Sequence, residues 1–118
     1  MTDPLKRQQT DYRLADTLAA FDLLRTLDRE IPGQLVSAFL YVASHNPCHK
    51  QAMEEDLGLT PASSSRLVDW LSDYHRLGKP GLGLVSKCKD PSNLRRVIVE
   101  LTPKGQELAD KMKSLLFA

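Results

Sequence analysis

Apolar residues recur every three to four positions along most of this chain, which is the spacing of amphipathic helices. The pattern predicts helices over residues 12–29, 34–44 and 50–57. Pro32-Gly33 and Asn46-Pro47 interrupt it, so we expect the first two helices to end before these pairs. The apolar face of the first helix comprises Leu14, Leu18, Phe21, Leu24 and Leu27.

A fourth helix is predicted to begin at Thr60-Pro61, because threonine caps helices and proline fits a first helical turn. Gly58 is suited to end the preceding helix in a left-handed conformation. The apolar side of the fourth helix carries Leu67, Leu71 and Tyr74, with Val68 and Trp70 nearby.

The pattern changes after residue 83, where two extended runs, residues 84–89 and 95–101, flank the turn-forming segment 90–93. This arrangement predicts a β-hairpin. Thr102-Pro103 then repeats the signature of a cap followed by proline, which predicts a last helix over residues 103–117. One face of that helix carries Leu108, Met112 and Leu115.

Composition indicates a soluble globular protein of one domain, residues 1–118, with 42% hydrophobic and 26% charged residues. No apolar run is long enough to predict a membrane-spanning helix or a signal peptide. Two cysteines do not make a disulfide framework, so we expect a reducing, cytoplasmic location.

Charge is distributed unevenly, although the net charge is only +1. Residues 76–104 carry seven basic side chains against two acidic ones, a local charge of +5, and the other residues carry nine against thirteen. DNA responds to the local field at the docking surface, so the basic region is compatible with DNA binding. The alternative is a solvated hairpin without a nucleic-acid partner.

The third and fourth helices, joined through Gly58-Leu59-Thr60, have the spacing of a helix-turn-helix. The second helix of such a unit presents its N-terminal residues to base edges in the major groove. Small side chains allow a close approach, and an arginine reaches phosphate or guanine. An ordinary capped helix with a serine cluster is the alternative. The candidate contacts here are Thr60, Ala62, Ser63, Ser65 and Arg66.

Over residues 50–112 the chain resembles the MarR-type transcriptional regulators. The fragments that carry the resemblance are Leu57-Gly58-Leu59-Thr60-Pro61, Ser65-Arg66-Leu67-Val68-Asp69, Gly83-Leu84-Val85, Asp90-Pro91 and Leu101-Thr102-Pro103-Lys104-Gly105. The resemblance implies a winged-helix dimer whose terminal helices intertwine. It also implies an Asp-x-Arg motif at the wing tip, in which the aspartate braces an arginine that enters the minor groove.

The stretch that matches this motif is Asn93-Leu94-Arg95, with asparagine in place of the acidic brace. We expect Arg95 to lie in a narrow A·T-rich minor groove and the lysines of the hairpin to face phosphates. The alternative is that these are solvated charges. The candidate contacts of the hairpin are Lys87, Lys89, Asn93, Arg95 and Arg96.

Two further features differ from the family pattern. The segment between Leu71 and Gly83 is longer than usual, which predicts an extension of the fourth helix through residues 72–76 and a loop over 78–82. The chain ends at Ala118, without the long final helix of the family. We therefore expect segments 1–31 and 103–118 to form the dimer interface and segment 50–101 to bind DNA.

Other chemistry has little support. No nucleophile, base and acid stand in a catalytic arrangement, so we expect no enzymatic activity and no cofactor. His45, Cys48 and His49 lack the spacing of a zinc site and are expected in an interhelical loop. An oxidant-sensing role for Cys48 stays open. Trp70 is expected in the core, which disfavours single-strand binding.

The sequence thus predicts a mainly helical, dimeric winged helix-turn-helix protein with a small β-hairpin wing. We expect it to bind double-stranded DNA sequence-specifically and to regulate transcription, as a repressor at a pseudo-palindromic operator. An unidentified small-molecule effector is left open. The alternative is a winged-helix module for protein–protein contact, such as an antirepressor or assembly factor, which the near-neutral charge and Asn93 leave open.

Overall fold

The computed structural model of the chain describes residues 5–73 and 78–117. The helices are α1 (Tyr12–Arg25), α2 (Gly33–Ser44), α3 (Lys50–Leu57), α4 (Pro61–Leu71) and α5 (Pro103–Leu116), and the strands are β1 (Cys48–His49), β2 (Val85–Asp90) and β3 (Asn93–Leu101). The predicted fold class, mainly helical with a β-hairpin, is confirmed.

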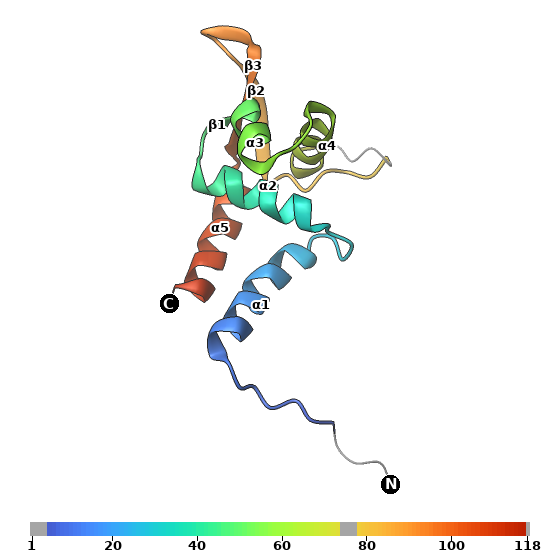
Figure 1. Ribbon diagram of the computed structural model, residues 1–118, viewed down its shortest axis with the longest axis vertical. Helices are drawn as coiled ribbons and strands as arrows, with labels where there is room; N and C mark the ends of the chain where they lie inside the picture. Colours follow the sequence, from blue (N-terminus) through green and yellow to red (C-terminus); the bar gives the residue numbers. More distant parts are fainter. Residues whose placement is uncertain (1–4, 74–77, 118) are drawn as a thin grey trace.

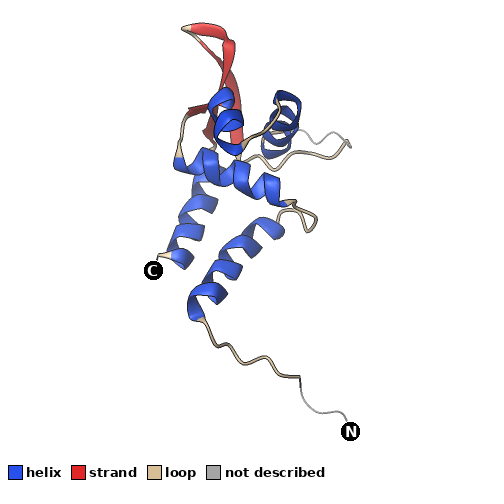
Figure 2. Ribbon diagram, in the orientation of Figure 1, coloured by secondary structure: helices blue, strands red, loops and turns tan. Residues whose placement is uncertain are grey.

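The strands form one antiparallel sheet in the order β1-β3-β2, and the β2–β3 hairpin projects from one end of the molecule (Figure 1). Helices α2, α3 and α4 pack at the base of this hairpin, and α1 and α5 lie side by side at the other end. Figure 2 shows that the strands are confined to the end away from α1. The hairpin is therefore free to act as a wing.

The core lies where α2, α3, α4 and the base of the sheet meet. Its largest fully buried side chains include Leu35, Phe39, Val42, Met53, Val68, Leu71, Leu84 and Val99. Gly105, in the first turn of α5, packs so closely that an added Cβ would lie 2.0 Å from the carbonyl oxygen of Leu84. Glycine is therefore required where α5 crosses the start of the wing.

The helix boundaries agree closely with the pattern of the sequence. Helix α3 has the predicted bounds, and Gly58 ends it with a φ of 66°. Thr60 and Thr102 cap α4 and α5 by accepting backbone N–H groups, as predicted. Helix α1 ends at Arg25, four residues earlier than expected, because residues 26–28 close into turns on the carbonyls of Asp22 and Leu24.

Strand β1 was not predicted. Cys48 and His49 were expected in an interhelical loop, and that expectation is wrong for both, because they pair with Val99 and Ile98 of β3. Two residues are too few to show a strand periodicity.

The predicted extension of α4 is wrong at its first residue. Ser72 has φ −92° and ψ −98°, which is not helical, so α4 ends at Leu71. Residues 74–77, including Tyr74 and Arg76, lie outside the described part of the chain. Three backbone hydrogen bonds return the chain to the end of α4, from the N–H groups of Leu82, Gly83 and Leu84 to the carbonyls of Trp70, Ser72 and Leu71.

The two terminal helices use their apolar faces differently. Met112 of α5 is buried, and Leu108 and Leu115 are partly buried against the core, so this face packs within the chain. Leu14 and Leu18 of α1, in contrast, remain 68% and 60% exposed. The chain thus presents an unpartnered apolar stripe on α1.

Candidate nucleic-acid interface

One carboxylate connects α3 to α4. Glu54 of α3 lies 2.5 Å from the Lys50 ammonium and accepts a hydrogen bond from the Ser64 hydroxyl of α4. Burial opposes the ionisation of Glu54, but the two hydrogen bonds outweigh it and lower the pKa of this carboxyl below its ordinary value. Glu54 and Ser64 were not among the predicted residues. Ser64 shares the helical spacing of Val68 and Leu71, which is the signal that could have found it.

The N-terminus of α4 is shaped by Thr60. Its hydroxyl oxygen accepts the Ser63 N–H at 3.1 Å and its O–H donates to the Ser63 hydroxyl oxygen at 3.0 Å. The Arg66 guanidinium donates a long hydrogen bond of 3.4 Å to that same hydroxyl. Ala62 and Arg66 are exposed, and Ser63 and Ser65 are half-buried. The predicted residues therefore lie together, with Thr60 engaged as the cap.

The wing contributes a row of basic side chains along β2 and β3. Lys87 forms an ion pair with Asp69 of α4, which places the base of the wing beside that helix. Lys89, Arg95 and Arg96 are exposed, and none of them has a side-chain hydrogen bond or ion pair with a residue that the structure describes. Their charges are therefore available to a partner.

Asn93 does not brace the Arg95 guanidinium. Its side-chain carbonyl accepts the backbone N–H of Arg95 at 3.1 Å, which shapes the turn. The turn is also held by Asp90, whose Oδ1 accepts the N–H and the hydroxyl of Ser92 at 2.9 and 2.8 Å. The other oxygen of Asp90 lies 2.8 Å from Nε2 of His49, on β1. The hydrogen bond with His49, followed by those from Ser92, lowers the pKa of Asp90 to about 2.

A second polar contact connects the helix-turn-helix to the rest of the chain. The Tyr41 hydroxyl of α2 donates to the Asp56 carboxylate of α3 at 2.6 Å, and this hydrogen bond raises the pKa of Tyr41 to about 12. The His45 ring stacks on Tyr41, with 4.1 Å between the ring centroids. His45 is thus a packing residue at the end of α2.

Neither cysteine is in a disulfide, and the Cys48 thiol is half-buried. Burial raises the pKa of Cys48, which reduces the reactive thiolate at neutral pH and disfavours an oxidant-sensing role. The described residues hold no group of three or more side chains arranged to bind a metal ion. None of the helices that the structure describes is both long and apolar enough to cross a membrane.

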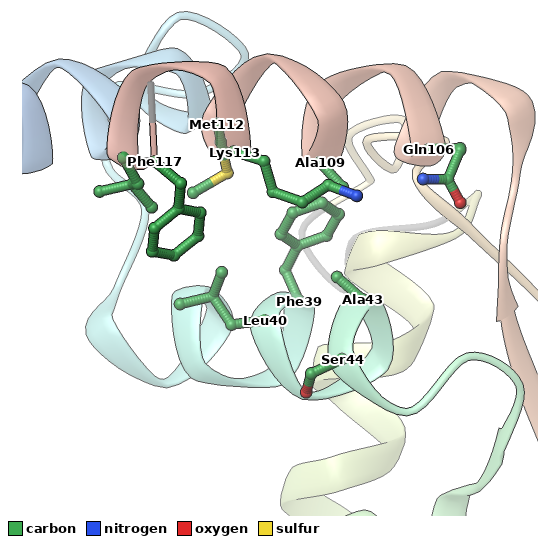
Figure 3. A pocket seen from close by; sticks show the side chains of 10 residues that line it. Phe39, Leu40, Ala43, Ser44, Gln106, Ala109, Met112, Lys113 and Phe117 are labelled. Atoms are coloured by element: carbon green, nitrogen blue, oxygen red, sulfur yellow. The ribbon is translucent and has the colours of Figure 1, made fainter.

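An apolar groove of about 380 Å³ lies between α2 and α5, away from the wing. Figure 3 shows Phe39 and Leu40 of α2 on one side of it and Met112 and Phe117 at the end of α5 on the other. Lys113 and Gln106 supply the polar rim. The groove and the row of basic residues are therefore separate sites.

A three-helix unit whose last helix is followed by a β-hairpin defines a winged-helix protein. Solved structures specify the class further. The chain is similar to a mutant MarR from E. coli complexed with operator DNA, over 90% of this chain and 69% of that one, with a TM-score of 0.64 and 17% identity. It is also similar to a transcriptional regulator from Thermotoga maritima, over 87% and 66%, with a TM-score of 0.66 and 18% identity.

A MarR-family regulator from Rhodococcus sp. RHA1 matches over 86% of this chain and 65% of its own, with a TM-score of 0.60 and 20% identity. This chain thus spans about two thirds of the length of these structures. No protein-family model matches it, and no curated protein matches it in sequence. The chain has the winged-helix fold of the MarR-type regulators.

Proposed function

We propose that this protein binds double-stranded DNA sequence-specifically and regulates transcription, without enzymatic activity or a cofactor. The observation that carries the proposal is the pairing of an exposed α4 N-terminus with a basic wing beside it. Arg66 is available to a base edge or phosphate, and Arg95 and Arg96 carry charges without partners in the described structure. The similarity to a MarR crystallised with operator DNA supports the same reading. We also propose a cytoplasmic location, which fits this role.

Duplex titration tests this proposal. A labelled random-sequence duplex at low salt should bind, and log K should fall linearly with log salt as counterions are released. Selection from a random DNA pool should then enrich one motif. Absence of binding to any duplex at low salt would favour the alternative, a winged-helix module for protein–protein contact, which the net charge of +1 supports.

We further propose that the protein acts as a homodimer and represses transcription at a pseudo-palindromic site. Leu14, Leu18 and Phe21 lie on one side of α1 at helical spacing and are exposed. Such an apolar stripe is costly in water and fits a twofold contact with its own copy. Two recognition helices related by that axis read half-sites about one helical turn apart.

Light scattering after gel filtration measures the oligomeric state. Leu14→Ser with Leu18→Ser should convert a dimer to a monomer, because both side chains leave water only in the dimer. Leu94→Ser is the matched control, since Leu94 is equally exposed, at 67%, but lies on the wing. A wild-type protein that is monomeric while it binds DNA at full affinity contradicts the dimer. A reporter gene downstream of the selected site decides the sign of regulation.

For an effector, we propose an apolar small molecule bound in the groove between α2 and α5. The volume of about 380 Å³ and the apolar lining are typical of ligand pockets. The fluorescent probe anilinonaphthalene sulfonate should bind there and raise Tm. Ala43→Trp, which fills the groove from α2, should abolish both effects, and Ala62→Trp on α4 should not.

A further inference from the structure

The turn at the tip of the wing is held from outside the hairpin. Asp90, the last residue of β2, accepts two hydrogen bonds from Ser92 through one oxygen and contacts His49 Nε2 at 2.8 Å through the other. His49 is the residue before Lys50, the first residue of α3. One carboxylate therefore connects the wing turn to the start of the helix-turn-helix.

This contact crosses the sheet. Strand β3 lies between β1 and β2, and His49 pairs with Ile98, which faces Cys88 of β2 on its other side. The His49 side chain thus reaches over β3 to the strand beyond it. In addition to the two-residue pairing of β1 with β3, this side-chain contact connects the far strand of the wing to the residue that precedes α3.

At the tip, Asn93 stands where an acidic side chain could brace the Arg95 guanidinium. The Asn93 carbonyl is occupied by the backbone N–H of Arg95, and the Arg95 guanidinium has no partner among the described residues. The direction in which Arg95 is presented therefore depends on the backbone of the turn. That backbone is held by Asp90.

We propose that His49 and Asp90 are positioning residues, which set the wing tip relative to α4 so that Arg95 and Arg66 engage DNA in a fixed register. The contact is well placed for this role, because the Asp90 side chain is only 13% exposed and that of His49 is 37% exposed. Hydrogen bonds with an ionised partner are short and directional. The expected effect on DNA binding rests on the proposed function, whereas the contact between His49 and Asp90 does not.

Three variants separate positioning from general stability. His49→Ala removes the contact, and His49→Gln keeps a side-chain N–H able to donate to Asp90 and should rescue it. His45→Ala is the matched control, because His45 is exposed, stacks on Tyr41 and has its ring hydrogen bonds with Ser44 and Tyr41 of α2.

The first measurement uses the protein without DNA. Backbone ¹⁵N order parameters of residues 92–96 should fall below roughly 0.6 in His49→Ala and stay near the wild-type values in His49→Gln and His45→Ala. The second measurement is the ratio of Kd values for duplexes with A·T-rich and G·C-rich flanks. His49→Ala should lose this preference by about threefold or more, because a mobile arginine no longer reads groove width.

The outcomes are distinguishable. If the wild-type protein binds no duplex, the proposed function fails, and the order parameters still decide whether His49 braces the wing. If the wild type binds DNA but His49→Ala retains both the amide order and the flank preference, the positioning role is overturned. If the amide order falls in His49→Ala and in His49→Gln alike, the hydrogen bond is not what holds the turn.

Discussion

The α3–α4 unit and the wing both carry candidate DNA contacts, but they are held in opposite ways. In the helical unit, Glu54 is engaged by Lys50 and Ser64, and it is only 13% exposed. In the wing, Arg95 and Arg96 extend into solvent without described partners. A helix that must fit the major groove needs a fixed angle, whereas an arginine that enters the minor groove needs a guanidinium available for DNA on a backbone that is held in place.

This difference predicts which substitutions change folding stability and which change DNA affinity. Substitutions inside the polar contacts of the helical unit should reduce the free energy of unfolding. Those on the free charges should change DNA affinity and leave folding unchanged, because surface substitutions away from packed contacts have small effects on stability.

Glu54→Ala should have the largest effect on folding stability. It removes one acceptor that the Lys50 ammonium and the Ser64 hydroxyl share and leaves them the Pro61 carbonyl, at 3.4 and 3.2 Å, so we expect a loss of about 1–2 kcal/mol in the free energy of unfolding. Urea denaturation measures it. Glu55→Ala, an exposed glutamate on the same helix, is the control. Equal effects in the two variants would show that the contacts of Glu54 do not stabilise the helical unit.

Arg66→Ala should weaken binding to the selected site by about 1–3 kcal/mol while changing the free energy of unfolding by less than about 0.5 kcal/mol. Among the residues that the structure describes, its side chain has one hydrogen bond, the long one to Ser63. Fluorescence anisotropy measures the DNA affinity, and urea denaturation measures the free energy of unfolding. Arg25→Ala on α1 controls for the loss of one positive charge. A matching loss of folding stability would assign Arg66 to the fold.

Arg95→Ala should cost about 1 kcal/mol or more for sites with A·T-rich flanks and less for G·C-rich ones. Asn93→Asp sharpens this test. An aspartate oxygen can still accept the Arg95 N–H, and its charge can hold the guanidinium, so affinity should rise slightly. If Arg95→Ala binds every duplex like the wild type, the wing does not read DNA and the protein-interaction alternative gains support.

The two wing lysines should differ in their salt dependence. Lys89 has no ion pair with a residue that the structure describes, so Lys89→Ala should lower the slope of log K against log salt by about 0.9, the value for one phosphate contact. Lys87 is paired with Asp69, so Lys87→Ala should change the slope less, and Asp69→Asn should raise it by releasing Lys87. Titrations at four salt concentrations give the slopes. Equal slopes for the two alanine variants would show that the ion pair opens on DNA.

The smallest effect concerns pH. Because the pKa of Asp90 is lowered to about 2, its contribution to the wing is present above the ordinary value of 3.8 and is lost as pH falls through about 2. The ¹³C shift of its carboxyl group should titrate there. In His49→Ala the midpoint should move up toward 3.8, since the largest cause of the lowering is gone. His45→Ala should leave it unchanged.

The sequence by itself determined the elements that local chemistry encodes. The bounds of α3, the left-handed Gly58, and the threonine caps of α4 and α5 follow from side chains within a few residues of each boundary. The order of helices and hairpin was enough to predict the winged-helix fold. The predicted site residues of α4 also lie together, because they fall within the first two turns of the helix.

Tertiary structure decided what depends on residues far apart in the chain. Strand β1 exists because β3 offers Cys48 and His49 a partner fifty residues away, and no local signal marks it. The pairing of Lys87 with Asp69 and of His49 with Asp90 likewise depends on how the wing folds back on the helices. Side chains of the same type thus differ in role, because long-range contacts determine which charges are paired inside the molecule and which remain available to a partner.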